Sequence, residues 1–410
     1  MGALKLGLIA ATLFIIAVVN DWSTPDRLII TLLAAFAITW VWSRLSLARL
    51  GLKRTLSLDR VRAGDWITEE FSLANQALLP KLWVEVRDLS SLPNHRAGRV
   101  VNVGSRSTSS WTVTTRCERR GRYRLGPLSI SSGDPLGVFD SRKLIPATHE
   151  LVVYPPQVDV SDVPIPMANM TGGRAINVNG VMAAHTISGI REYNVGDPLN
   201  RIAWSATARL GRMMVKEFDP DPTSDVWIML DLNDPTASNR DDHAEQSQLV
   251  GPSTDEAQEY AIALAGSVAE LCLDGGRKVG LIVNRAMPIR IDADNSQRQW
   301  FRIFESLAVA SSFGKRPIEE AIQAEARRFS RSAGLIVITA SSESHWVNAA
   351  RSLVQRHVPV TAVLVADQHL PDAPAMQELA SALVDVRVAV AQFSPGERLA
   401  AQASRTAVVA

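Results

Sequence analysis

The chain has 410 residues, of which 46% are hydrophobic and 21% are charged. This length and composition fit two or three domains with cores of their own and exclude a disordered protein. The net charge of +1 gives no overall basic excess, so we expect no nucleic-acid partner. Two distant cysteines, Cys117 and Cys272, exclude a disulfide framework.

Two apolar stretches, residues 4–20 and 28–42, open the chain with a short polar turn between them. Their length approaches the roughly 20 residues that cross a bilayer, and tryptophans near their ends are typical interface anchors. We therefore expect residues 1–50 to form a transmembrane helical hairpin. A cleaved signal peptide is the alternative for the first stretch, but the second apolar stretch directly after it argues against cleavage.

The charges around these stretches predict the topology. Basic residues follow the second stretch, and residues 44–124 contain 16 Lys and Arg against 7 Asp and Glu. The positive-inside rule then predicts a multi-pass protein of the inner (plasma) membrane with both termini cytoplasmic and the lipid bilayer as a partner. The basic residues either touch anionic lipid or form an ordinary solvated surface, and both interpretations stay open.

Residues 51–156 show a two-residue alternation of apolar and polar side chains, which is typical of strands with one buried face. The alternation is clearest in Leu82–Arg87 and Trp111–Cys117, and turns rich in Gly and Pro separate the short segments. Short strands at this spacing predict a β-sandwich of about 100 residues.

Residues 225–390 change to uninterrupted apolar segments that alternate with amphipathic ones. The expected strands are 226–230, 279–283, 335–338 and 360–365, and the expected helices are 256–273, 299–311, 317–329, 345–355 and 375–383. This order predicts a doubly wound, Rossmann-like parallel sheet covered on both faces, with binding residues at the carboxyl ends of its strands. Residues 157–224 are expected to be a linker with a signature segment, and 391–410 a tail.

The most distinctive residues lie in this linker. They read Arg191-Glu192-Tyr193, Gly196-Asp197, Arg201-Ile202-Ala203-Trp204 and Ala208-Arg209. The run resembles the signature of the domain of unknown function 58 family, and residues 120–127 and 134–139 are similar to that family's preceding region. The resemblance implies a von Willebrand factor A-like C-terminal domain, and it implies MoxR-type AAA+ ATPases and other membrane proteins as partners. It implies no reaction.

Two interpretations of the signature are open. The residues that we single out are Arg191, Tyr193, Gly196, Asp197, Arg201, Trp204 and Arg209. They form either a buried polar network that fixes the domains together or an arginine-rich surface for an anionic ligand or a partner. Asp197 is placed to cap a helix, and Arg201 and Arg209 are spaced to share one helix face.

The resemblance also raises the question of a metal ion. A von Willebrand factor A-like domain holds Mg²⁺ with Asp-x-Ser-x-Ser, a Thr and a second Asp, because a hard cation takes oxygen ligands. Here Asp231 and Asn233 can offer oxygens, but Pro235 ends the motif, and Arg316 and Ala340 stand where Thr and Asp are expected. We therefore predict a degenerate metal site and no cofactor, with Mg²⁺ as the alternative.

Arg316 suggests a replacement for the ion. Its guanidinium, placed opposite Asp231, would supply the positive charge that the ion supplies elsewhere. An Arg316 that faces solvent is the alternative.

The chain contains no phosphate-binding P-loop, no zinc-protease motif and no nucleophile-elbow motif. We therefore predict that it is not an enzyme but a membrane-anchored, cytoplasmic-side protein-interaction module, acting with a MoxR-type AAA+ ATPase in envelope or complex maintenance. A Mg²⁺-dependent, adhesion-type ligand-binding domain is the alternative. A third and weaker hypothesis is an enzyme that uses Asp197, Arg201 and Arg209 in phosphate or peptide chemistry.

Overall fold

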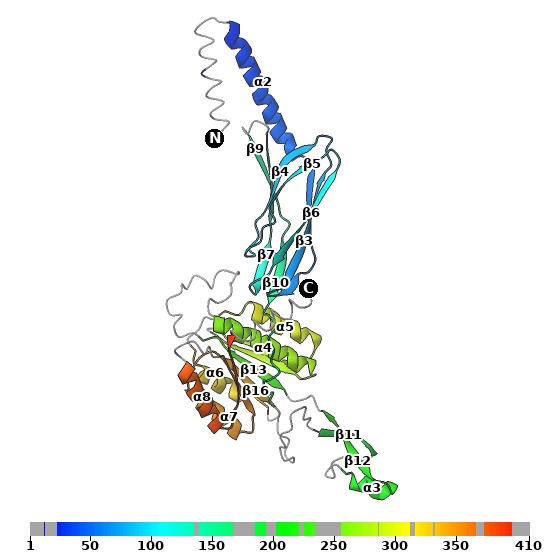
Figure 1. Ribbon diagram of the computed structural model, residues 1–410, viewed down its shortest axis with the longest axis vertical. Coiled ribbons are helices and arrows are strands. Elements are labelled where there is room, and N and C mark those ends of the chain that lie inside the picture. Colours follow the sequence, from blue (N-terminus) through cyan, green and yellow to red (C-terminus); the bar gives the residue numbers. More distant parts are fainter. Residues whose placement is uncertain are drawn as a thin grey trace. The chain divides into compact units, whose positions relative to one another are not determined.

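The computed structural model describes residue 12 and residues 23–134, 139–166, 185–193, 202–220, 225–233, 256–285, 287–311, 316–330, 333–365 and 373–395. The chain divides into two compact units, Met1–Tyr154 and Pro155–Ala410 (Figure 1). The first is rich in strands, and the second contains helices and a parallel sheet.

In the described part of the strand-rich unit, helix α2 (Ser23–Ser46) comes first and ten strands follow it. They are β1 (Leu50–Leu56), β2 (Arg60–Arg62), β3 (Trp66–Asn75), β4 (Lys81–Asp88), β5 (Arg99–Val103), β6 (Thr108–Arg116), β7 (Gly121–Leu125), β8 (Leu128–Gly133), β9 (Asp140–Ile145) and β10 (His149–Tyr154). They form three sheets with the orders β1-β3-β6, β5-β4-β8-β9 and β2-β10-β7. All pairs are antiparallel except β2 with β10.

Alternating side chains explain how these sheets pack. In β3 the buried residues Ile67, Phe71 and Leu73 alternate with more exposed ones, so one face of the strand points inward. Phe71 stacks on Trp111 of β6 with ring centroids 5.4 Å apart, and both belong to a cluster that also contains residues of β4 and β8. The core of this unit therefore lies between the first two sheets.

Helix α2 contains the second predicted membrane span, and it uses part of its surface to pack on protein. Thr39, Ser43 and Ser46 are buried, and the Ser43 hydroxyl lies 2.7 Å from that of Ser141 in β9. The Phe36 ring meets the Phe139 ring edge-on at 5.0 Å.

The transmembrane prediction is wrong for the part of the chain that the structure describes. Among the described helices, none is both long and apolar enough to cross a membrane. The apolar stretch 28–42 is short and contains threonines. The prediction of a multi-pass inner-membrane protein is therefore not supported either. The first span, residues 4–20, lies outside the described residues apart from Thr12.

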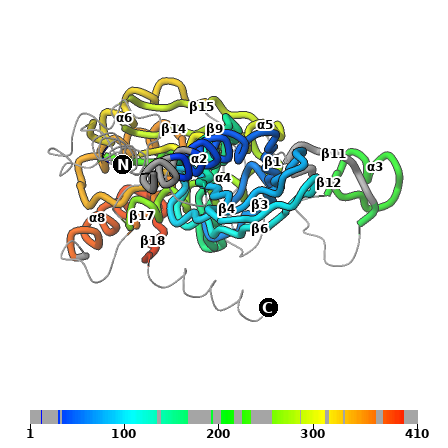
Figure 2. Tube along the Cα trace, turned by 90° about the horizontal axis from the view of Figure 1, so that it is seen from above, coloured from blue at the N-terminus to red at the C-terminus, as the bar shows by residue number. Residues whose placement is uncertain are grey.

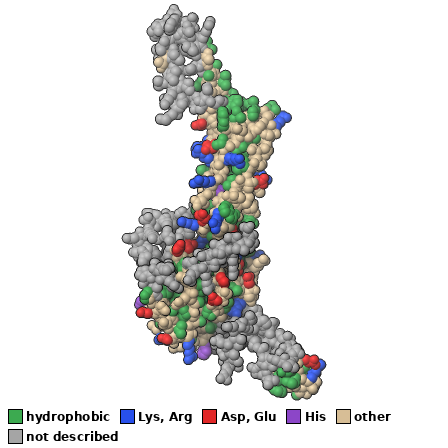
Figure 3. All heavy atoms as spheres, in the orientation of Figure 1, with side chains coloured by type: hydrophobic (Ala, Val, Ile, Leu, Met, Phe, Trp, Pro, Cys, Tyr) green, Lys and Arg blue, Asp and Glu red, His purple; other side chains and the backbone are tan. Residues whose placement is uncertain are grey.

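Basic side chains of the strand-rich unit are interspersed with acidic ones on the face shown in Figure 3. This view is that of an ordinary solvated surface.

The second unit is built around a six-stranded sheet. Its elements are β13 (Val226–Asp231), α4 (Glu256–Asp274), β14 (Val279–Asn284), β15 (Ile289–Asp294), α5 (Gln297–Ala308), α6 (Ile318–Ala326), β16 (Gly334–Thr339), α7 (Val347–Gln355), β17 (Val360–Val365), α8 (Ala373–Asp385) and β18 (Ala389–Phe393). The order is β15-β14-β13-β16-β17-β18, with β15 antiparallel and the other strands parallel.

Helices cover both faces of this sheet, α4 and α5 on one and α6, α7 and α8 on the other (Figures 1 and 2). Every residue of β13, β14, β16 and β17 is buried, as expected for parallel strands covered on two sides. The fold is therefore mixed α/β with many strands, as the sequence predicts apart from the membrane hairpin.

A smaller group of elements precedes the six-stranded sheet in the sequence of the second unit. Strands β11 (His185–Glu192) and β12 (Met214–Pro220) pair antiparallel. Helix α3 (Trp204–Leu210) lies between them in the sequence, directly before β12. We call these three elements the signature arm, because the family signature falls within them.

Candidate functional site

Three neighbouring strands of the parallel sheet each end on a buried polar residue. Asp231 ends β13, Asn284 ends β14 beside it and Thr339 ends β16 on the other side. Their exposed fractions are 4%, 1% and 1%, and the strand register pairs Asp231 with Asn284. The carboxyl edge of a parallel sheet is where α/β proteins place their binding residues.

Neutral hydrogen-bond donors surround the Asp231 carboxylate. Asn284 Nδ2 donates to its Oδ1 over 2.9 Å, and Thr339 Oγ1 donates to its Oδ2 over 3.0 Å. The backbone N–H of Asn233 adds a longer contact of 3.3 Å to Oδ1. The carboxylate is thus held in place by amide and hydroxyl groups of three strands' ends.

Burial raises the pKa of Asp231 to about 6, although the hydrogen bonds from Asn284, Thr339 and Asn233 each lower it, and the negative charge of Glu343 adds to the rise. Burial in a low dielectric favours the neutral acid. Asp231 can therefore change its protonation state close to neutral pH.

The donor set does not fit a magnesium ion. Mg²⁺ requires oxygens that converge in an octahedral array, whereas Asn284 and Thr339 turn N–H and O–H groups toward Asp231. Asn233 offers its backbone N–H to the carboxylate, and its Oδ1 and that of Asn284 are buried without a hydrogen-bond partner among the described residues. The hydrogen bonds thus occupy both oxygens of Asp231, and the two unpartnered amide oxygens alone do not make an octahedral set.

The hypothesis that Arg316 replaces a cation is wrong. Its guanidinium Nη2 donates to the backbone carbonyl of Glu320 over 3.2 Å, in the first turn of α6. What reaches the site is the Arg316 backbone carbonyl, which accepts a hydrogen bond of 3.0 Å from Asn284 Nδ2. The backbone of Arg316 therefore contacts the end of β14, while its side chain bonds to α6.

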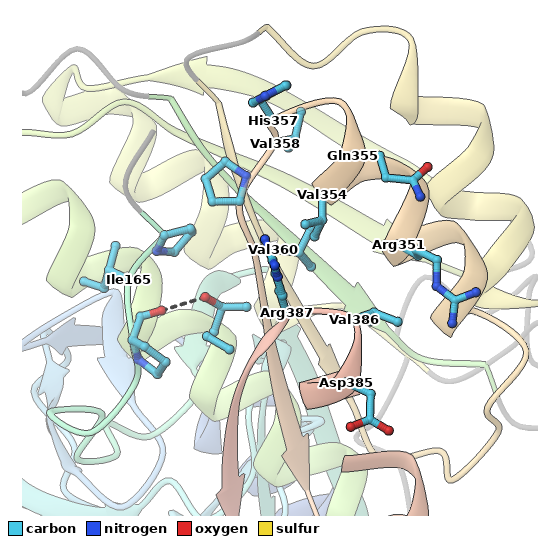
Figure 4. Close-up of a pocket in the computed structure, with 15 residues that line it drawn as sticks. Ile165, Arg351, Val354, Gln355, His357, Val358, Val360, Asp385, Val386 and Arg387 are labelled. Carbon is cyan, nitrogen blue, oxygen red and sulfur yellow. Dashed lines mark hydrogen bonds between the residues drawn. The ribbon is translucent and has the colours of Figure 1, made fainter. Parts of the chain in front are cut away.

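A cavity of about 750 Å³ lies at the opposite, amino-terminal edge of the same sheet (Figure 4). It is bordered by the starts of β17 and β18, by the ends of α7 and α8 and by residues 164–166. Thr361 Oγ1 donates to the Pro164 carbonyl over 2.7 Å, the dashed line in Figure 4, and so fixes that wall. Its charged residues are Arg351, His357, Asp385 and Arg387.

The structure places only part of the predicted signature residues. Arg191 lies in β11, although its side chain is outside the described part, and Tyr193 follows directly with its backbone N–H bonded to Met213 O at 2.9 Å. Trp204 begins α3 and Arg209 lies in its last turn. The remaining three, Gly196, Asp197 and Arg201, are outside the described residues, so the pairing and capping expected of them stay predictions.

Helix α3 is attached by its backbone rather than by a buried side-chain face. Ala203 N–H bonds to Met214 O and Met214 N–H to the Thr207 hydroxyl, yet the helix itself has no buried residue. Trp204 is 68% exposed, and Leu210 and Met213 are exposed too. This leaves an aromatic and two aliphatic side chains on one short helix and the turn after it.

The order of these motifs agrees with a family comparison. A model of the family described as "Protein of unknown function DUF58" matches residues 189–392. Residues 189–392 are thus similar to the DUF58 family, and we refer to them as the DUF58 region. The match covers most of the signature arm and nearly all of the parallel sheet, and therefore includes Trp204, Arg209 and Asp231.

Relatives of this DUF58 region give no activity. The uncharacterized protein Rv1480 of Mycobacterium tuberculosis is 27% identical over 191 residues, 44% of this chain and 56% of its own. The uncharacterized protein YeaD of Bacillus subtilis is 22% identical over 190 residues, 43% of this chain and 46% of its own. The chain thus spans about half the length of the curated relatives it matches.

Two solved structures each resemble about a quarter of the chain. The CARDB domain of a Pyrococcus furiosus protein is 15% identical with a TM-score of 0.20, covering 26% of this chain and 94% of its own. The C-terminal domain of wzt is 10% identical with a TM-score of 0.21, covering 27% and 75%. Such weak similarity carries no functional argument.

Proposed function

We propose that the DUF58 region is a non-enzymatic protein-interaction module and that the signature arm is its contact surface. The partner is a MoxR-type AAA+ ATPase, the class that the family resemblance implies. The parallel sheet serves as the rigid domain of von Willebrand factor A type from which the arm extends in sequence.

The exposed side chain of Trp204 carries this proposal. Tryptophan and arginine are enriched among the few residues that dominate binding energy at protein interfaces. In α3 a largely exposed Trp204 occurs with an exposed Arg209 and the exposed Leu210. An apolar side chain of this size left in solvent by a helix without buried residues is the kind of surface that a partner covers.

The strand order supports the domain type. Numbered by their sequence within the sheet, the strands have the order 3-2-1-4-5-6 with strand 3 antiparallel, which is a doubly wound arrangement. We take this arrangement as support for a domain of von Willebrand factor A type.

The Asp231 cluster supports a role without catalysis. A general base or a nucleophile must reach a substrate, whereas Asp231, Asn284 and Thr339 are only 4%, 1% and 1% exposed. We therefore interpret the cluster as structural: its hydrogen bonds hold the carboxyl ends of β13, β14 and β16 together.

The test is a binding titration of the full chain with the MoxR-type ATPase of the same organism. Trp204→Ala should weaken binding tenfold or more. Trp66→Ala is the matched control, since Trp66 in β3 is also 62% exposed, and it should leave the affinity unchanged. Equal affinity of the Trp204→Ala variant and the wild type would reject the arm as the contact surface.

A further inference from the structure

We propose that the cavity at the amino-terminal edge of the sheet binds an oxyanion, a carboxylate or a phosphate, carried on an apolar group. This site is separate from Asp231, which lies at the carboxyl end of β13, and from the signature arm. It concerns a ligand that the proposed interaction function does not require.

The size and floor of the cavity suit a small organic molecule. Its volume of about 750 Å³ lies within the usual range for ligand pockets, roughly 300–1,000 Å³. Apolar side chains from three directions form much of its lining: Ile165, Val354, Val358, Val360 and Val386. In Figure 4 Arg387 lies between Ile165 on one side and Val354 and Arg351 on the other. An apolar ligand body can therefore lie on this floor beside a cation.

The charged groups at the rim are predominantly basic. Arg351, His357 and Arg387 line the cavity, and Asp385 is its single acidic residue among those described. No described residue forms an ion pair or a side-chain hydrogen bond with any of these four. Arginine presents a fork of donors that matches carboxylate and phosphate oxygens. The protein thus leaves its cations available to a ligand.

Two of these basic residues occupy unusual backbone positions. His357 and Arg387 have φ of 65° and 64°, the left-handed region that normally favours glycine at the end of a helix. Both follow the same local pattern: Val358 N–H bonds to Leu353 O after α7, and Val388 N–H bonds to Leu383 O after α8, each over 3.0 Å. A helix-ending motif with a basic residue in place of glycine therefore occurs twice beside one cavity.

Left-handed conformations are unfavourable for non-glycine residues, and strain of this kind clusters at ligand-binding sites. The competing explanation is that a cation stabilises the carbonyl groups at a helix C-terminus. That explanation accounts for one basic residue at each helix end, and it predicts no ligand. Binding therefore separates the two explanations.

The experiment titrates the full chain with four probes by NMR or calorimetry: hexanoate, acetate, hexanamide and inorganic phosphate. Hexanoate should bind at least tenfold more tightly than hexanamide, because only the former has the charge, and more tightly than acetate, which lacks the apolar body. Comparing phosphate with acetate shows which oxyanion the cations prefer.

Variants locate the binding. The double variant His357→Gly with Arg387→Gly keeps the left-handed turns without strain, so it should fold while its affinity for hexanoate falls tenfold or more. Arg106→Gly is the matched control, because Arg106 also has a positive φ, 49°, but lies in the strand-rich unit. Asp385→Asn should tighten binding by removing the acid.

Equal affinities for hexanoate and hexanamide would overturn the proposal, as would an unchanged affinity in a double variant whose thermal midpoint shows that it is folded.

Discussion

Each unit of the molecule buries carboxylates, and the two units neutralise them in different ways. In the strand-rich unit the side chains of Arg54, Glu69, Asp88 and His95 are all almost fully buried. Arg54 pairs with Glu69 and with Asp88, and His95 Nε2 lies 2.9 Å from Asp88 Oδ2 and 3.2 Å from Glu69 Oε2. In the α/β unit Asp231 is surrounded by neutral donors alone.

The comparison shows how burial and charged partners together set the pKa of a buried carboxylate. Burial raises the pKa of Glu69 even though His95 and Arg54 lower it, so ionic partners reduce the effect of burial without abolishing it. With two carboxylates and one arginine, one additional proton makes the ionic cluster neutral. A divalent ion would instead leave an excess positive charge beside Arg54, although Glu69, Asp88 and His95 converge closely enough to ligate one. The ionic cluster is therefore a structural network that already contains its cation.

Removing Arg54, the cation of this cluster, should cause the largest loss of stability. Arg54→Met leaves two buried carboxylates without their arginine, and removing one partner of a buried ion pair typically costs about 3–5 kcal/mol. We expect this loss in the free energy of unfolding of the strand-rich unit, measured by urea denaturation and by amide hydrogen exchange in β3. Arg87→Met is the control, because Arg87 pairs with Glu85 at the surface, where such pairs contribute about 1 kcal/mol or less. Similar losses in both variants would show that the buried cluster is not stabilised by its arginine.

The protonation state of Asp231, in the α/β unit, should have the next largest effect on stability. The folded-state pKa of Asp231, about 6, lies above its ordinary value of 3.8. The stability contributed by protonated Asp231 is therefore fully present below pH 3.8 and is lost as the pH rises through about 6. The loss amounts to about 3 kcal/mol. Urea denaturation of the α/β unit between pH 4 and 8 measures it.

Asp231→Asn should remove this pH dependence. Asp294→Asn is the control, because Asp294 is partly exposed and the hydrogen bond from Ser296 lowers its pKa, so its titration lies below this range. An unchanged slope in the Asp231→Asn variant would mean that the carboxylate is not responsible.

The sequence predicts the buried half of this architecture better than its edges. Uninterrupted apolar runs predict β13, β14, β16 and β17, because parallel strands covered on both faces have no polar side. Strand β15, whose sequence alternates charged and apolar residues, escapes prediction. Strand β18 falls partly in the predicted tail 391–410. Strands β15 and β18 are the two edges of the sheet, and neither consists only of buried residues.

The sites follow the same rule. Asp231 is predictable because it ends an apolar strand, but Asn284 and Thr339 become its partners through strand register, which one chain's pattern does not reveal. Arg316 was misplaced because its backbone, not its side chain, faces the strand ends. The ionic cluster joins residues from four separate segments, and no local spacing indicates it.

Two threonines allow the two sites to be compared with the same substitution. Thr339→Val removes the hydroxyl that donates to Asp231 Oδ2. A hydrogen bond to a charged group contributes about 1.5–3 kcal/mol, and its loss should also raise the pKa of Asp231 further. Urea denaturation at pH 8 should show the full loss and at pH 4 a smaller one, since the protonated carboxyl needs the donor less. An equal loss at both values would contradict the assignment of Thr339 as a donor to the charged form.

Thr115→Val is the matched change in the strand-rich unit and should have the smallest effect. The Thr115 hydroxyl lies 2.9 Å from His95 Nδ1, and both threonines are buried. Because Arg54 supplies a full positive charge to the cluster, the hydroxyl serves to orient the imidazole, and a hydrogen bond between neutral groups contributes about 0.5–1.5 kcal/mol. The free energy of unfolding at pH 8 should therefore fall less than in Thr339→Val. A larger loss in Thr115→Val would reverse the comparison, because it would mean that the ionic cluster depends on its neutral donor more than Asp231 does.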